Sequence, residues 1–267
     1  MAPDAPARTA LVTGAAGGIG ARVVDALVAD GCRVLALDLA LGAEHDLPGV
    51  AHALAPPAAL TALAERHGDA VLTVVGDVRD PAVAEAAVRR CLDRWGRLDV
   101  VVAAAAVIAG GRPLWETPTE ELDTQWDVGA RGVWHVARAA VPAMLAGPDP
   151  GGCRFVAVAS AAGGRGLYAL SAYTMVKHAV VGLVRGLAAD LVGTGVTVVA
   201  VSPGATDTAM LRATADLYGV TTDDLAAHQL LRAALPPAQL AETIRFCCST
   251  AGRVLNGSVV AADGGFG

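Results

Sequence analysis

The chain has 267 residues, which suits one large α/β domain and is long enough to bury a substantial core. Its formal net charge is -6 at pH 7 and its basic residues form no cluster, which argues against nucleic acid as a partner. Although 54% of the residues are hydrophobic, many of these are Ala and Val. No stretch reaches about 18 uninterrupted apolar residues, so we expect no membrane span.

The first predicted elements lie within residues 9–31. A short β-branched run, TALVT at 9–13, is followed by the glycine-rich sequence GAAGGIG at 14–20 and by a helical pattern up to Gly31. A strand, a glycine turn and a helix in this order are typical of a dinucleotide-binding fold. The missing side chains let the backbone approach a pyrophosphate, and the N-terminus of the helix supplies N–H donors.

The second predicted strand, residues 33–37, ends at Asp38. An acidic residue at this point is placed to accept hydrogen bonds from the adenosine ribose and to repel a 2′-phosphate. The alternative is a solvated acid at the end of a strand. Because the glycine turn contains no Arg or Lys that would attract a 2′-phosphate, the sequence predicts NAD rather than NADP as the cofactor.

Residues 39–57 interrupt the regular pattern. The segment is rich in Gly, Ala and Pro and shows no clean period, so we expect a surface insertion beside the adenosine end of the cofactor. It contains His45, Asp46 and His52, but nothing in the sequence fixes their geometry for a metal ion, and the five cysteines of the chain have no metal-ligand spacing. We therefore expect no metal.

Strands and helices alternate through the rest of the chain, and residues 205–236 are predicted to form a substrate lid. Further strands are predicted at 71–75, 98–106, 154–160, 196–201 and 258–262, and helices at 57–68, 81–92, 119–144, 172–191 and 240–248. This alternation predicts an α/β fold: a Rossmann-type doubly wound parallel sheet of about seven strands with helices on both faces. Residues 1–267 would form a single domain.

The candidate catalytic residues are Ser160, Tyr173 and Lys177. Ser160 ends a predicted strand, whereas Tyr173 and Lys177 lie one turn apart at the start of the next helix, so all three can face a pocket at the carboxyl ends of the strands. Lys177 is the one lysine among the 20 Lys and Arg residues of the chain. A Tyr and a Lys four residues apart also share a helix face in many unrelated proteins, so the pair is weak evidence by itself.

The chemistry follows from these residue types. A phenol has a pKa of about 10 and is a poor acid–base catalyst at neutral pH unless its phenolate is stabilised. An ammonium one helical turn away is expected to lower that pKa. Tyr173 would then exchange a proton with an alcohol, and Ser160 would hydrogen-bond the substrate oxygen, where charge develops. The expected partner is a small-molecule alcohol or carbonyl compound.

These residues closely resemble the short-chain dehydrogenase/reductase family over nearly the whole chain. The family motif T-G-x-x-x-G-x-G matches residues 13–20, Y-x-x-x-K matches 173–177, and P-G-x-x-x-T matches 203–208. The resemblance implies that Ser160, Tyr173 and Lys177 are catalytic. The cofactor-binding residues that we predict from the turn, Asp38 and this resemblance are Gly14, Gly18, Ile19, Gly20, Asp38, Leu39, Asp77, Val78, Ala104, Ala105, Tyr173, Lys177, Pro203, Gly204, Thr206 and Thr208.

Two departures from the family pattern stand out. The N-N-A-G sequence after the fourth strand is replaced by four alanines at 103–106, and the Asn of the following helix is replaced by Gly129. In the family that Asn supports a water chain from the catalytic Lys to solvent. Together with the insertion and the run 106–115, these departures resemble the mycofactocin-coupled subgroup. That resemblance implies a tightly held NAD, clasped by the insertion and reoxidised in place by the peptide-derived carrier mycofactocin.

Two alternatives remain open from the sequence. One is an ordinary short-chain reductase with freely exchanging NAD(H), and the other is a catalytically weak NAD-binding protein, as Gly129 and the alanine run suggest. Family resemblance also implies a homotetramer packed through the long helices and the C-terminal strand. Residues 1–10 lack the apolar core of a signal peptide and most of the cysteines lie in apolar runs, so we expect a cytoplasmic location.

Overall fold

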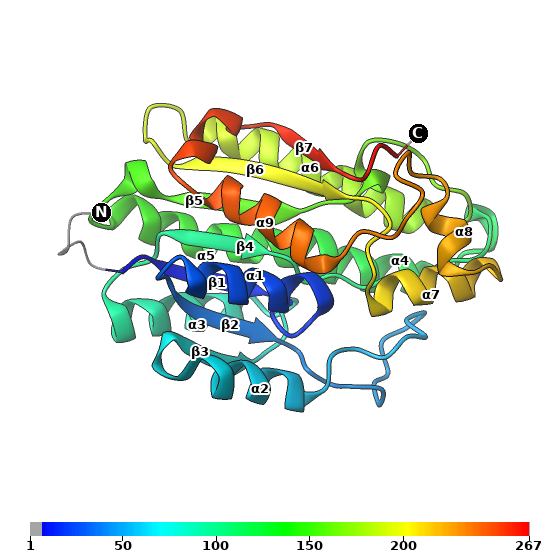
Figure 1. Cartoon of the computed structure of the whole chain (residues 1–267), viewed down its shortest axis with the longest axis horizontal. Coiled ribbons are helices and arrows are strands. Elements are labelled where there is room, and N and C mark those ends of the chain that lie inside the picture. The colour runs from blue at the N-terminus through cyan, green and yellow to red at the C-terminus, as the bar shows by residue number, and fades with distance from the viewer. Residues whose placement is uncertain (1–6, 267) are drawn as a thin grey trace.

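Seven parallel strands form one sheet in the order β3-β2-β1-β4-β5-β6-β7 (Figure 1). The computed structural model describes residues 7–266. The strands are β1 (Thr9–Thr13), β2 (Arg33–Asp38), β3 (Val71–Val75), β4 (Val100–Ala103), β5 (Arg154–Val158), β6 (Thr197–Pro203) and β7 (Val259–Ala262). The strand order reverses between β1 and β4, which is the point where ligands bind in such sheets. The predicted doubly wound parallel sheet is confirmed.

Helices cover both faces of the sheet (Figure 1). One apolar cluster joins the sheet to α1 (Gly18–Ala29), α2 (Pro57–His67) and α9 (Pro237–Cys248). The cluster on the opposite face joins it to α3 (Pro81–Trp95), α5 (Gly132–Ala146) and α6 (Ser171–Asp190), and α4 (Thr119–Trp126) packs beside α6. Every residue of β1, β4, β5 and β6 is buried, as expected of strands covered on both sides. Within residues 7–266, no helix combines the length and apolarity that crossing a bilayer requires.

Two predicted strands are too long. The prediction of 98–106 is wrong at both ends, since β4 spans Val100–Ala103. At the carboxyl end, the backbone N–H groups of Ala104 and Ala105 donate to the hydroxyl oxygen of Thr13, at 3.2 and 3.4 Å. The prediction of 154–160 is wrong at its carboxyl end. There Ser160 begins a short helical turn by accepting a hydrogen bond from the N–H of Ala162 at 3.2 Å. Regular strand pairing therefore ends at Ala103 and Val158, earlier than the apolar runs of the sequence suggest.

The predicted helix 119–144 is two helices, α4 and α5, joined by a wider π-helical turn at Asp127–Arg131. Gly129 lies within this turn. A Cβ atom added to Gly129 would lie 2.7 Å from Cγ1 of Val176 on α6. The π-helical turn and α6 therefore approach each other more closely than a side chain at position 129 allows. Turns of this kind are frequent at functional sites.

The predicted lid contains two short helices beyond the carboxyl end of β6, α7 (Ala209–Tyr218) and α8 (Thr222–Ala226). Thr208 caps α7 by accepting a hydrogen bond from the N–H of Leu211, and Thr221 forms a capping box with Asp224. At the other end of α7 the hydroxyl of Tyr218 donates to the carbonyl oxygen of Tyr168. The lid is thus tied to the loop between β5 and α6.

Candidate active site

The turn between β1 and α1 forms a surface without side chains. A Cβ atom on Gly14, whose φ is +65°, would lie 2.7 Å from the backbone nitrogen of Ala105, and one on Gly18 would lie 2.6 Å from Cγ2 of Thr208. A Cβ atom on Gly20 would overlap the carbonyl oxygen of Gly14. Because α1 begins here and has no acidic residue in its first turn, this cradle fits the pyrophosphate of a dinucleotide.

Asp38 is held rigidly at the end of β2. Its two carboxylate oxygens accept hydrogen bonds from the N–H groups of Ala16 and Ala40, each at 2.9 Å. Burial raises the pKa of Asp38, while these backbone hydrogen bonds act in the opposite direction. Each carboxylate oxygen keeps a further lone pair, so the group is able to accept hydrogen bonds from ribose hydroxyls as the sequence predicts.

Asp77 and Val78 follow β3 on the same edge of the sheet. The carboxylate of Asp77 accepts hydrogen bonds from the side chain and the backbone N–H of Arg79, at 2.8 and 2.9 Å. The carbonyl oxygen of Val78 lies 3.0 Å from Nδ1 of His135 on α5. These contacts fix the short segment that is expected to flank the adenine.

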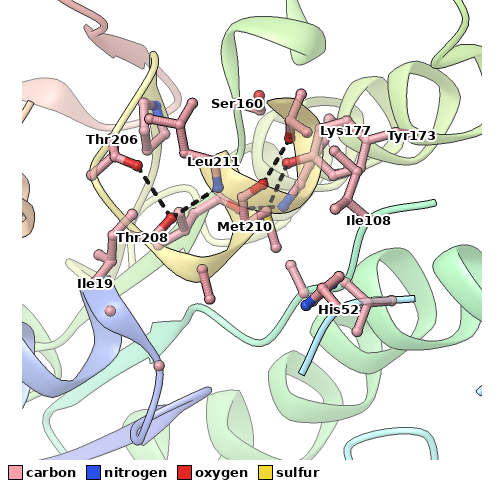
Figure 2. Close-up of a pocket in the computed structure, with 18 of the residues that line it drawn as sticks. Ile19, His52, Ile108, Ser160, Tyr173, Lys177, Thr206, Thr208, Met210 and Leu211 are labelled. Carbon is pink, nitrogen blue, oxygen red and sulfur yellow. Dashed lines mark hydrogen bonds between the residues drawn. The ribbon is translucent and has the colours of Figure 1, made fainter. Parts of the chain in front are cut away.

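Ser160, Tyr173 and Lys177 come together beyond the end of β5 (Figure 2). The ammonium of Lys177 lies 5.6 Å from the centre of the Tyr173 ring and donates to the carbonyl oxygen of Val158 at 3.0 Å. The hydroxyl of Tyr173 makes a weak hydrogen bond to the sulfur of Met210 on the lid, at 3.8 Å. The segment that carries α7 therefore lies directly against the phenol.

Burial dominates the protonation of this pair, because Tyr173 is 7% exposed and Lys177 is 2% exposed. Burial raises the pKa of Tyr173 to about 12, partly offset by hydrogen bonding with Ser160, and lowers the pKa of Lys177 to about 8. The expectation that the ammonium lowers the tyrosine pKa is therefore wrong for the protein without its cofactor. Loss of water on burial disfavours both charged forms, which raises the pKa of the phenol and lowers the pKa of the amine.

All the predicted catalytic and cofactor-binding residues line one cavity of about 710 Å³. The glycine turn and Asp38 line it beyond β1 and β2, whereas Ser160, Tyr173 and Lys177 line it beyond the end of β5. The sequence thus located the whole edge of the sheet on which the cavity lies. Among residues 7–266, no group of three or more His, Cys, Asp or Glu side chains is arranged to hold a metal ion.

Part of the cavity wall comes from the segment predicted as a surface insertion. Its residues 42–55 form a loop closed by backbone hydrogen bonds between Gly42 and both Leu54 and Ala55. Leu47 and Val50 are buried in the main apolar cluster, which is the one that joins the sheet to α3, α5 and α6. Leu47 and Leu54 also line the cavity, together with His52. The segment is therefore only partly on the surface. The large apolar residues Leu47, Val50 and Leu54 within a Gly- and Pro-rich stretch were the signal that the sequence offered.

The cavity is apolar beside the phenol. Ile108, Leu170 and Tyr173 belong to one buried cluster, against which Leu167 and Met210 pack. The sequence predicted a lid at 205–236, which includes Met210, but did not single out Ile108 and Leu170, because both lie in irregular segments without a hydrophobic period. An apolar wall around a Ser–Tyr pair suits an apolar molecule that carries a single reacting oxygen.

Gly129 faces α6 next to the position of Lys177, because a Cβ atom on it would lie 2.7 Å from Cγ1 of Val176. The space is filled by Val176, which is 1% exposed and precedes Lys177 on α6. Among residues 7–266, the hydrogen-bond acceptor of the Lys177 ammonium is the carbonyl oxygen of Val158. The sequence could show that the Asn was replaced, but not that a valine fills its space.

A glycine cradle, a carboxylate at the end of β2 and a Ser–Tyr–Lys set on one edge of a doubly wound sheet define a dinucleotide-dependent oxidoreductase. The family model described as enoyl-(acyl carrier protein) reductase matches residues 14–267. The chain belongs to the short-chain dehydrogenase/reductase family and is an enzyme of that class.

Relatives of known sequence and structure agree with this assignment. The chain is 32% identical to an uncharacterized oxidoreductase of Mycobacterium tuberculosis, over 97% of this chain and 96% of the relative. It is 30% identical to the (-)-trans-carveol dehydrogenase of Rhodococcus erythropolis, over 97% and 96% of the two chains. The crystal structure of carveol dehydrogenase from Mycobacterium avium in complex with NAD is similar, with a TM-score of 0.87, 27% identity and 97% of each chain covered.

Proposed function

We propose that this enzyme is an NAD-dependent dehydrogenase that interconverts an apolar alcohol and its ketone or aldehyde. The observation that carries the proposal is one cavity in which Ser160, Tyr173 and Lys177 lie between the glycine cradle and an apolar wall. NAD is the cofactor: the carboxylate of Asp38 lines the cavity at the end of β2, where an acidic residue is expected to bind the adenosine ribose, and the similar carveol dehydrogenase was solved with NAD.

Bound NAD supplies the hydride acceptor for alcohol oxidation, and the protein supplies the proton chemistry. Tyr173 accepts the hydroxyl proton as the alcohol is oxidised and returns it to the oxygen in the reverse direction. Ser160 donates a hydrogen bond to the same oxygen. For this step the pKa of Tyr173 must fall from about 12, and the ammonium of Lys177, one turn away on α6, stabilises the phenolate once the site carries a further positive charge.

Single-turnover reduction of bound NAD by a panel of apolar secondary alcohols tests this function. The absorbance of NADH should rise in the wild-type protein with at least one alcohol, and Tyr173→Phe should react far more slowly because it has no proton acceptor. Equal rates in the two proteins would remove the role proposed for Tyr173. Failure of every alcohol and every matching ketone would favour the catalytically weak NAD-binding protein instead.

We further propose that the NAD is held tightly and recycled in place by mycofactocin. The loop 42–55 supports this, because its ends are tied together and its Leu47 and Val50 are buried beside the cavity. Gly129 and the alanine run at 103–106 support it too, because they resemble the mycofactocin-coupled subgroup. The test is to denature freshly purified protein and assay the released nucleotide by mass spectrometry. Less than a few per cent of NAD per subunit would contradict tight binding.

The alternative enzyme is a reductase with freely exchanging NAD(H). In that case, added NAD⁺ and an alcohol should turn over many times without any carrier. Under the mycofactocin proposal, the same mixture should stop after about one turnover and resume when a redox carrier is added. The number of NADH molecules formed per subunit therefore distinguishes the two proposals.

We also propose a homotetramer in the cytoplasm. Trp134 on α5 is 60% exposed and Val259 on β7 is 37% exposed, which leaves apolar side chains on the two elements expected at subunit contacts. The five cysteines are buried and free, as suits a reducing compartment. Sedimentation equilibrium should give the mass of four chains, and a monomeric mass would contradict the proposal.

A further inference from the structure

The loop 42–55 passes from the end of β2 to α4 and forms one wall of the cavity (Figures 1 and 2). At its far end, a Cβ atom on Gly49 would overlap the side chain of Glu121 on α4. Leu47 and Val50 anchor the loop in the main apolar cluster, which also contains Val78. The loop is therefore held where its two ends meet, at Gly42 and Ala55, and also at its tip around Gly49. These contacts hold His52, which lines the cavity, in place.

Two histidines set the chemistry of this loop. Nε2 of His45 lies 2.9 Å from the carbonyl oxygen of His52, and Nδ1 of His52 lies 3.2 Å from the carbonyl oxygen of Ala53. Because a carbonyl oxygen only accepts hydrogen bonds, each of these ring nitrogens carries the proton. Nε2 of His52 is thus left with a lone pair. It is buried, and no other group in residues 7–266 donates a hydrogen bond to it.

A buried acceptor without a donor is costly, so the partner is expected to come from a ligand. Burial and the neighbouring His45 ring lower the pKa of His52, which keeps the ring neutral at pH 7. A neutral ring that presents a lone pair cannot pair with a phosphate oxygen, which is itself an acceptor. The donor must therefore be a hydroxyl or an amino group, and NAD carries both in its two riboses, its adenine and its carboxamide.

We propose that Nε2 of His52 accepts a hydrogen bond from a hydroxyl or amino group of bound NAD and so latches the loop 42–55 onto the cofactor. The inference rests on NAD as the cofactor. The alternative donor in the same cavity is the hydroxyl of the substrate. The cofactor is the better match, because the loop follows Asp38 and Leu39, which line the same cavity as His52 and are the residues expected to bind the adenosine ribose.

The test measures how fast NAD leaves the full-length protein. Wild-type enzyme and the variants His52→Phe, His52→Gln and His178→Phe are loaded with NAD, mixed with excess isotopically labelled NAD and sampled by mass spectrometry. The Phe variant keeps a ring of similar shape without a nitrogen, and the Gln variant supplies an amide oxygen as acceptor. His178 lies exposed on α6 and serves as the matched control. Thermal unfolding of each protein verifies that it is folded.

NAD exchange should be about tenfold faster in His52→Phe than in the wild type, the loss expected for one hydrogen bond to a buried acceptor. His52→Gln should recover most of the difference, and His178→Phe should match the wild type. Equal exchange in His52→Phe and the wild type overturns the latch. So does a variant that changes only KM for the alcohol, because His52 would then face the substrate. A wild-type protein that takes up no NAD overturns the proposed cofactor as well, which separates the two failures.

Discussion

Replacing Lys177 by methionine is expected to stabilise the cofactor-free protein while abolishing its activity. The ammonium of Lys177 is 2% exposed, and the carbonyl oxygen of Val158 is its hydrogen-bond acceptor within residues 7–266. Methionine has a similar length and no charge, so it fills the same space without the desolvation penalty. The side chain of Lys177 is therefore expected to destabilise the fold that holds it.

The magnitude follows from the pKa. Burial lowers the pKa of Lys177 from 10.5 to about 8. At about 1.4 kcal/mol per pKa unit, this difference corresponds to a cost of about 3 kcal/mol when the buried amine is charged. Removing the amine also leaves the carbonyl of Val158 without its donor, which costs about 1 kcal/mol. We expect a net gain of about 2 kcal/mol in the free energy of unfolding at pH 7.

The gain should fade with rising pH. Below the folded pKa of about 8, Lys177 is charged in both states and the full cost is present. Between that pH and 10.5, the unfolded chain holds a proton that the folded chain has released, so the stability of the wild type rises with pH. Tyr173 is present in both proteins, and its own titration cancels in the comparison.

Urea unfolding of nucleotide-free protein at pH 7 and near the unfolded lysine pKa measures both effects. Arg185→Met is the matched control, because it removes an exposed cation from the same helix and should change the stability by less than about 0.5 kcal/mol. A Lys177→Met protein that is less stable than the wild type at pH 7 would refute the reasoning. So would a gain that is unchanged at high pH.

Three further outcomes are expected. Tyr173→Phe should slow single-turnover reduction of bound NAD by about 10²- to 10⁴-fold, with little change in NAD content; an unchanged rate contradicts its role as acid and base. Gly129→Asn should lose about 1–3 kcal/mol of stability to the clash with Val176, and adding Val176→Ala should recover most of it in thermal unfolding; a single variant as stable as the wild type would disprove the close contact. Asp38→Asn should reduce the preference for NAD over NADP by about tenfold or more in titrations with both nucleotides, because the repulsion of the 2′-phosphate is lost; an unchanged preference would show that Asp38 does not discriminate.

The sequence predicted the doubly wound parallel sheet and its binding edge because both produce patterns among residues that are close together in the chain. A buried parallel strand appears as an uninterrupted apolar run, and the glycine turn of residues 14–20 follows directly after such a run. Ser160, Tyr173 and Lys177 were found the same way, from their places at the end of a strand and the start of a helix. Strand ends such as Ala103 were placed less well, because contacts with a neighbouring strand decide where the chain leaves the sheet.

The sequence by itself thus determined the doubly wound fold, and it pointed to residues that the structure brings together around one cavity. Only the tertiary structure decided how these residues behave. The pKa of Tyr173 is raised rather than lowered because the surrounding elements remove water from both members of the Tyr–Lys pair. The loop 42–55 reaches α4 and turns His52 toward the cavity through contacts between residues far apart in the chain. Burial and long-range contact depend on the whole packed molecule, so no local pattern in the sequence can express them.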